Sequence, residues 1–229
     1  MDVEGQCFWL SAGHIVEEIA ELLDSPGTTV TALIADIFSP GGSTHAIPFV
    51  LNRNELAFIH DTELKLDFGL IPIRDNYLRM LRSNGTEVLT KKNWQSQHTI
   101  EFHSYSLLGI PAQLAGATDS GGFRLGLTLV PITNVELVDA EGEAAGYHRL
   151  RGRISADMGS LESIKGMSGG PLLGFNHSDP PRYWVVGIQS TWLPQSKTIF
   201  ACPLPLIGEL AGTVWRQISQ RNEEPTLDS

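Results

Sequence analysis

Three segments of the chain place apolar residues at helical spacing. In residues 14–24 apolar positions recur every three or four residues opposite a glutamate-bearing face, and a Ser-Pro-Gly sequence ends the run. Residues 205–219 carry a second apolar face, followed by a polar tail, and a shorter pattern covers Asn76–Leu81. These patterns predict three helices.

The other apolar segments are short, rich in β-branched residues and separated by Gly, Pro, Asn and Asp. Many short strands with few helices favour an all-β barrel or sandwich over β-α-β units. The predicted strands are Thr28–Phe38, Ala46–Leu51, Leu56–His60, Leu66–Ile73, Tyr105–Ile110, Leu125–Leu129, Asn134–Leu137, Tyr147–Ser155, Pro171–Phe175, Tyr183–Gln189 and Thr198–Pro203.

Charge and cysteine content narrow the classes of function. Sixteen basic and 26 acidic residues give a net charge of −10, whereas a nucleic-acid-binding protein normally carries a positive surplus. Cys7 and Cys202 form neither a disulfide framework nor a four-ligand zinc site. The sequence has no long apolar run and no secretory pattern. We therefore expect a cytoplasmic protein with no nucleic-acid or membrane partner and no metal or other cofactor.

The most specific segment is the Gly-Met-Ser-Gly-Gly-Pro sequence at residues 166–171. Glycines around Ser168 let the backbone turn sharply, so that successive N–H groups can converge as an oxyanion hole requires. A plain glycine-rich turn is the alternative. The nucleophile elbow, Gly-x-Ser-x-Gly, also fits the letters, but it needs a following helix and then an acid before a histidine. Here Pro171 opposes a helix, and His177 precedes Asp179.

The base for Ser168 must therefore lie upstream. His14 follows a strand-like run and the small residues Ser-Ala-Gly, which leave room for a substrate, and it opens a predicted helix. Asp67 begins an apolar strand, where a carboxylate needs a hydrogen-bond partner. An acid so placed can orient an imidazole. Asp61, in a polar turn, is the alternative acid, and the remaining histidines belong to no motif.

Together these segments resemble the trypsin-like (chymotrypsin-fold) serine peptidases, especially the bacterial ones that lack disulfides. The family order of His, Asp and Ser matches His14, Asp67 and Ser168. Ser-Ala-Gly-His is similar to the family's Thr-Ala-Ala-His, Asp-Phe-Gly-Leu-Ile to Asp-Ile-Ala-Leu-Leu, and residues 166–171 to Gly-Asp/Asn-Ser-Gly-Gly-Pro. Further similarities lie at residues 108–111, 186–190 and 200–204.

The resemblance implies two packed antiparallel β-barrels, residues 1–115 and residues 116–229, the second with a C-terminal helix across it. It implies a serine endopeptidase that cleaves protein or peptide substrates through an acyl-enzyme, with the N–H groups of Gly166 and Ser168 as the oxyanion hole. The substrate-binding residues that it suggests are Glu162, Ser190, Thr191 and Trp192. Only 13 residues precede His14, so the first barrel is short of a strand or closes with one from elsewhere.

Two further hypotheses remain open at this stage. One is a catalytically silent trypsin-like scaffold that binds a protein partner through the cleft between the barrels. The other is a cytosolic regulatory protease with a restricted target and a regulatory protein partner, because unrestrained cytosolic proteolysis would be toxic.

Overall fold

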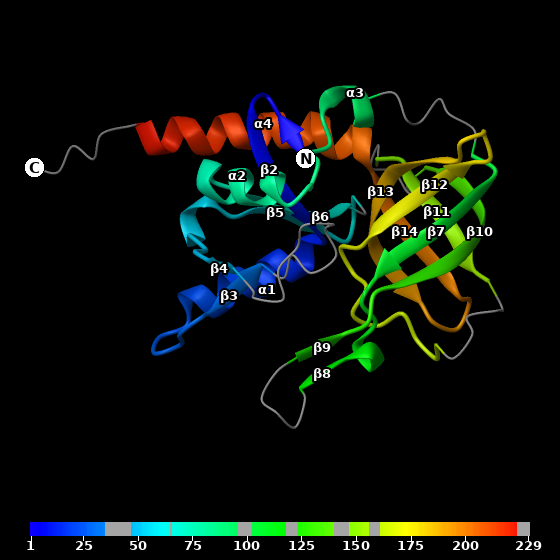
Figure 1. Cartoon of the computed structure of the whole chain (residues 1–229). Coiled ribbons are helices and arrows are strands. Elements are labelled where there is room, and N and C mark those ends of the chain that lie inside the picture. Colours follow the sequence, from blue (N-terminus) through cyan, green and yellow to red (C-terminus); the bar gives the residue numbers. More distant parts are fainter. Residues whose placement is uncertain are drawn as a thin grey trace, which may run out of the picture.

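A computed structural model (Figure 1) describes residues 1–34, 47–64, 66–95, 102–117, 123–139, 147–155 and 161–223. Its helices are α1 (Gly13–Asp24), α2 (Asp75–Ser83), α3 (Lys91–Trp94) and α4 (Leu204–Glu223). Its strands are β1 (Asp2–Val3), β2 (Gln6–Ser11), β3 (Ala32–Ile34), β4 (Ile47–Phe49), β5 (Ala57–Asp61), β6 (Leu66–Pro72), β7 (Ser104–Gly109), β8 (Ala115–Ala117), β9 (Phe123–Leu125), β10 (Thr128–Val138), β11 (Arg149–Ile154), β12 (Pro171–Asn176), β13 (Arg182–Leu193) and β14 (Thr198–Pro203).

The three predicted helices are confirmed as α1, α2 and α4. One strand prediction is wrong: Leu125–Leu129 is not continuous, because the N–H of Gly126 donates to the carbonyl of Leu114 and separates β9 from β10. The predicted strand Asn134–Leu137 belongs to the long β10, which has a bulge where Asn134 takes a φ of 52°. Of the predicted strand Thr28–Phe38, Ala32–Ile34 is a strand (β3), residues 28–31 are not, and residues 35–38 lie outside the described residues, as does Ala46 of the next predicted strand.

Six strands form a closed barrel in the order β10-β11-β14-β13-β12-β7. Closure leaves no free strand edge, and the interior is filled by apolar side chains, among them Leu107, Val130, Met167 and Leu172. The strand β7 pairs with β10 and β12. A boundary at residue 115 would assign β7 to the first part of the chain, whereas its hydrogen bonds place it in the barrel.

The first part of the chain forms an open sheet in the order β1-β2-β6-β5. The strands β3 and β4 pair with each other in a separate two-stranded sheet, so the described residues of this part do not close a first barrel. The helix α1 covers β5 and β6. Its buried residues Val16 and Ala20 pack on Leu56.

The sheet and the barrel share one apolar core. Phe8, Phe68 and Leu70 of the sheet pack with Ile188 of the barrel and with Ile207 of α4. Figure 1 shows α4 running from the barrel over the first part of the chain. We expected this helix to lie across the barrel alone, but it joins both parts. Among the residues described, no helix has the length and apolar character that crossing a bilayer would require.

Candidate active site

Asp67 holds His14 at two points. The Nδ1–H of His14 donates to Asp67 Oδ2 at 2.8 Å, and the backbone N–H of His14 donates to Asp67 Oδ1 at 2.9 Å. The pairing of β2 with β6 brings the two residues together, because Ser11 lies opposite Gly69. Asp67 is 8% exposed and His14 is half-buried. Both carboxylate oxygens are thus occupied, and the imidazole is held in place, while its Nε2 has no hydrogen-bond partner among the described residues.

Gly13 explains how α1 can begin so close to Asp67. A Cβ atom at this position would lie 2.1 Å from the carbonyl oxygen of Ile59 and 2.9 Å from Asp67 Oδ1. Only glycine allows this approach without moving the helix away from the sheet. The small size of Gly13 beside the histidine is evident in the sequence, but its contact with β5 is not.

Asp61, the alternative acid, serves a different purpose. Its Oδ1 accepts hydrogen bonds from the backbone N–H groups of Glu63 and Leu64, both at 2.8 Å. This is the pattern by which an aspartate stabilises a turn. Of the two aspartates considered from the sequence, the structure brings Asp67 to His14 and leaves Asp61 in the turn after β5.

A second histidine lies next to His14, which the sequence did not indicate. The rings of His60 and His14 are 5.8 Å apart, because His60 in β5 is opposite Asp67 in β6. His60 Nδ1 is 2.7 Å from Glu17 Oε2. This hydrogen bond raises the pKa of His60 above its ordinary value, against a smaller lowering by burial. Only the register of the two strands could have revealed this neighbour.

The loop of Ser168 is shaped by glycine and by backbone hydrogen bonds. Gly166 and Gly169 have φ values of 91° and 82°, a region that side chains other than glycine rarely adopt. The N–H groups of residues 167, 169 and 170 donate to the carbonyls of Ile164, Gln189 and Met167. The N–H groups of Gly166 and Ser168 have no acceptor among the described residues. They are therefore free for a ligand.

This loop packs directly against the segment that leads to His14. A Cβ atom on Gly169 would lie 2.6 Å from Ser11 Oγ and 2.8 Å from the nitrogen of Ala12. Ser168 is half-buried. Among the described residues, Ser168 Oγ has no hydrogen-bond partner, His14 included. The structure thus brings His14 and Asp67 together and places the Ser168 loop beside them without joining Ser168 to His14.

The expected substrate-binding residues lie in different environments. Ser190 is buried on β13, and its hydroxyl donates to the carbonyl of Phe200 at 3.2 Å. Thr191 shares a cavity of about 350 Å³ with Asp67. Trp192 is half-buried and packs on the barrel core. Glu162 is exposed; its N–H donates to Gln113 Oε1, and its carboxylate has no partner among the described residues.

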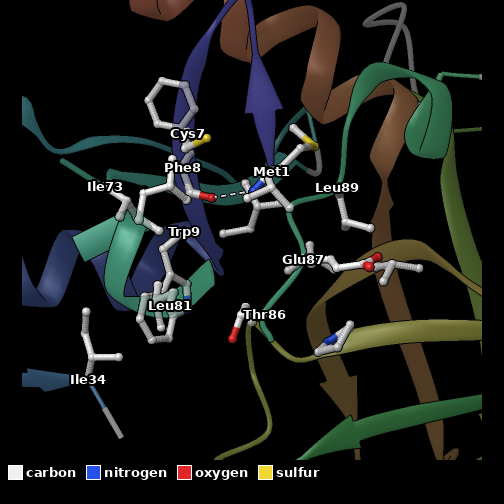
Figure 2. Close-up of a pocket in the computed structure, with 17 residues that line it drawn as sticks. Met1, Cys7, Phe8, Trp9, Ile34, Ile73, Leu81, Thr86, Glu87 and Leu89 are labelled. Carbon is white, nitrogen blue, oxygen red and sulfur yellow. Dashed lines mark hydrogen bonds between the residues drawn. The ribbon is translucent and has the colours of Figure 1, made fainter. Parts of the chain in front are cut away.

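Two more cavities adjoin the Ser168 loop. One, of about 430 Å³, is lined by Gly166 and Ser168 together with apolar side chains. The other, of about 500 Å³, lies between the sheet and the barrel. Figure 2 shows the second cavity with Phe8 and Trp9 of β2 on one side and Leu89 on the other. Trp9 lines both cavities.

The cysteines are buried thiols. Cys202 lies behind the triad candidates, with its Sγ 3.6 Å from the carbonyl oxygen of Asp67. Burial raises the pKa of the Cys202 thiol to about 11 and also raises the pKa of Cys7. Neither is therefore poised as a nucleophile, since the thiolate is the reactive form. In the part of the chain that the structure describes, no group of three or more His, Cys, Asp or Glu side chains could hold a metal ion.

No protein-family model and no curated protein matches this chain. Among solved structures it is similar to the active form of the Rv3671c protease from M. tuberculosis, at 14% identity and a TM-score of 0.41, covering 75% of this chain and 60% of that one. An inactive mutant form of Rv3671c from M. tuberculosis H37Rv gives 14% identity and a TM-score of 0.44, covering 95% and 78%. An inactive mutant of the murine norovirus NS6 protease is 13% identical with a TM-score of 0.36, and the match covers 85% of this chain and 81% of that one.

Proposed function

We propose that the protein is a serine endopeptidase with His14, Asp67 and Ser168 as its catalytic residues. The observation that carries the proposal is the two-point hold of Asp67 on His14, through Nδ1 and through the backbone N–H. This hold fixes the tautomer in which Nε2 is unprotonated and can accept a proton. A histidine needed only for packing would not require a buried carboxylate with both oxygens engaged.

The reaction then proceeds in two acyl-transfer steps. Ser168 Oγ attacks the scissile carbonyl carbon while its proton passes to His14 Nε2; the C–N bond breaks, and His14 gives the proton to the leaving amine. Water repeats the sequence on the acyl-enzyme and releases the second product. The free N–H groups of Gly166 and Ser168 would stabilise the oxyanion, each by about 3 kcal/mol.

The missing hydrogen bond between Ser168 and His14 is compatible with this mechanism. Catalytic hydrogen bonds are often long or poorly aligned in the free enzyme and tighten when substrate binds. The contact of Gly169 with Ser11 and Ala12 already places the Ser168 loop within two residues of His14 along the chain.

Covalent labelling tests the proposal. A fluorophosphonate probe, which phosphonylates only activated serines, should label the wild type at Ser168 and should not label Ser168→Ala. Ser11→Ala is the matched control, because Ser11 is the other serine against the Gly169 backbone; it should be labelled like the wild type. Labelling that survives in Ser168→Ala, or none in the folded wild type, would overturn the proposal.

A catalytically silent scaffold is the second candidate. It is favoured by the lack of a hydrogen bond between Ser168 and His14 among the described residues. A silent scaffold would not react with the fluorophosphonate even after a bound partner had been added, whereas an enzyme awaiting substrate would. The restricted cytosolic role and the regulatory partner expected from the sequence are part of the peptidase proposal. Incubation with cell extract, followed by a search for one cleaved protein and for co-eluting partners on gel filtration, tests them.

A further inference from the structure

The cavity of about 430 Å³ beside Ser168 has an apolar wall and no charged residue among its described lining. A cavity of this size can accommodate one or two large side chains. Its floor is the Gly166–Ser168 loop that carries the nucleophile and the proposed oxyanion donors. Its wall comes from four separate segments, and the apolar side chains there are Trp9, Leu33, Leu108, Ile110, Leu125 and Leu127.

Three of these side chains are large, apolar and exposed. Trp9 is 44% exposed, Leu33 is 55% exposed and Leu127 is 42% exposed. Single exposed apolar residues are common on protein surfaces, but a group of them around one hollow marks a binding site. Since the hollow contains Ser168, the occupant is the residue of a substrate that lies next to the scissile bond.

The position of the cavity indicates which half of the substrate it holds. The leaving nitrogen must face His14, which protonates it, and Trp9 lies on β2, the strand that leads directly into His14. The Ser190–Trp192 segment, expected to contact the acyl half, does not line this cavity; Thr191 lines the separate cavity that includes Asp67. The apolar cavity is therefore on the side of the departing amine.

We propose that this cavity binds an apolar side chain of the substrate, at the first or second residue after the cleaved bond, and that Trp9, Leu33 and Leu127 set this preference. The inference rests on the proposed function, because it uses the same Ser168. Burial of a leucine or phenylalanine side chain there should favour such substrates about tenfold or more over those with glycine at that place.

Acyl transfer to added amines tests the cavity directly. The purified protein is first supplied with whichever acyl ester it hydrolyses fastest from a panel, so that the Ser168 ester forms. Leucinamide, glycinamide or aspartic acid amide is then added as acceptor. Its amine nitrogen attacks the ester carbonyl carbon and gives a proton to His14; the C–N bond forms, the C–O bond breaks, and His14 passes that proton to Ser168 Oγ. The ratio of amide to acid product measures acceptor binding on the leaving side. We expect the ratio of amide to acid product to be about tenfold or more higher with leucinamide than with glycinamide.

Two matched variants complete the experiment. Leu127→Lys should abolish the advantage of leucinamide and favour aspartic acid amide, whereas Leu137→Lys should keep the wild-type order. Leu137 is 52% exposed, and it does not line this cavity. Equal partition of the three acceptors in the wild type, or an unchanged order in Leu127→Lys, would overturn the inference alone. Absence of any acyl-enzyme and of fluorophosphonate labelling would instead overturn the proposed function.

Discussion

Asp67→Asn is the most informative single change, because the structure dictates how the new amide must sit. The backbone N–H of His14 needs an acceptor at the Oδ1 position, 2.9 Å away. With the amide oxygen there, the NH₂ group takes the Oδ2 position, 2.8 Å from Nδ1 of His14. Nδ1 must then accept a hydrogen bond, so the ring proton moves to Nε2. In that tautomer His14 cannot take the proton of Ser168.

The opposite orientation of the new amide group is energetically unfavourable. It would set the NH₂ group against the backbone N–H of His14, which leaves a buried donor unsatisfied at a cost of about 1–3 kcal/mol. The wrong tautomer therefore predominates. In serine peptidases with a Ser-His-Asp triad the same change lowers kcat by about 10⁴, which corresponds to about 5.4 kcal/mol. We expect a loss of that order, with the fold retained.

Three measurements check this prediction: kcat on an acyl ester, the rate of fluorophosphonate labelling, and a ¹⁵N NMR spectrum that reports which ring nitrogen of His14 carries the proton. Asp61→Asn is the control. Its Oδ1 still accepts from the N–H groups of Glu63 and Leu64, so its kcat should stay near the wild-type value. Retention of more than about a tenth of the wild-type rate in Asp67→Asn, or loss of activity in Asp61→Asn instead, would refute the role assigned to Asp67.

Three further predictions concern the surroundings of the site. Gly13→Ala should destabilise the protein by about 1–3 kcal/mol in urea unfolding and slow fluorophosphonate labelling, because its Cβ would meet a backbone carbonyl at 2.1 Å; a stabilised variant, the usual result of Gly→Ala in a helix, would contradict this. Cys202, buried and with a pKa of about 11, should react with a thiol reagent at pH 8 only after denaturation. Glu17→Gln should lower the pKa of His60 in an NMR titration, because the hydrogen bond to Glu17 raises it. The stability that this pair adds should be full between about pH 5 and 6.5 and should vanish as pH rises through the folded-state pKa of His60; a difference that grows with pH would be contrary to this.

The local parts of the candidate site could be predicted from the sequence because each consists of contiguous residues. The apolar stripe of α1, the apolar run of β6 and the glycine-rich loop around Ser168 all depend on neighbours along the chain. The choice of Asp67 over Asp61 could be argued the same way, since a carboxylate in an apolar strand needs a partner and one in a polar turn does not. The structure supplies that partner in His14.

What the sequence could not predict depends on pairing between distant strands. The strand β7 follows the first part of the chain, yet it pairs with β10 and β12, and no alternation within Ser104–Gly109 reveals those partners. The neighbour relation between His60 and His14 arises from the register of β5 on β6. The strands β3 and β4 pair with each other and not with the main sheet. For this reason the described residues of the first part of the chain form an open sheet, where we expected a barrel.

Close approach between backbone segments, more than hydrogen bonding between side chains, brings the two parts of the candidate site together. Gly13 brings α1 to Asp67. Gly169 brings the Ser168 loop to Ser11 and Ala12. Behind these contacts, the core shared by the sheet, the barrel and α4 holds both parts in one packed unit, and packed interiors resist small displacements. The position of the Ser168 loop relative to His14 therefore depends on the joint packing of both parts.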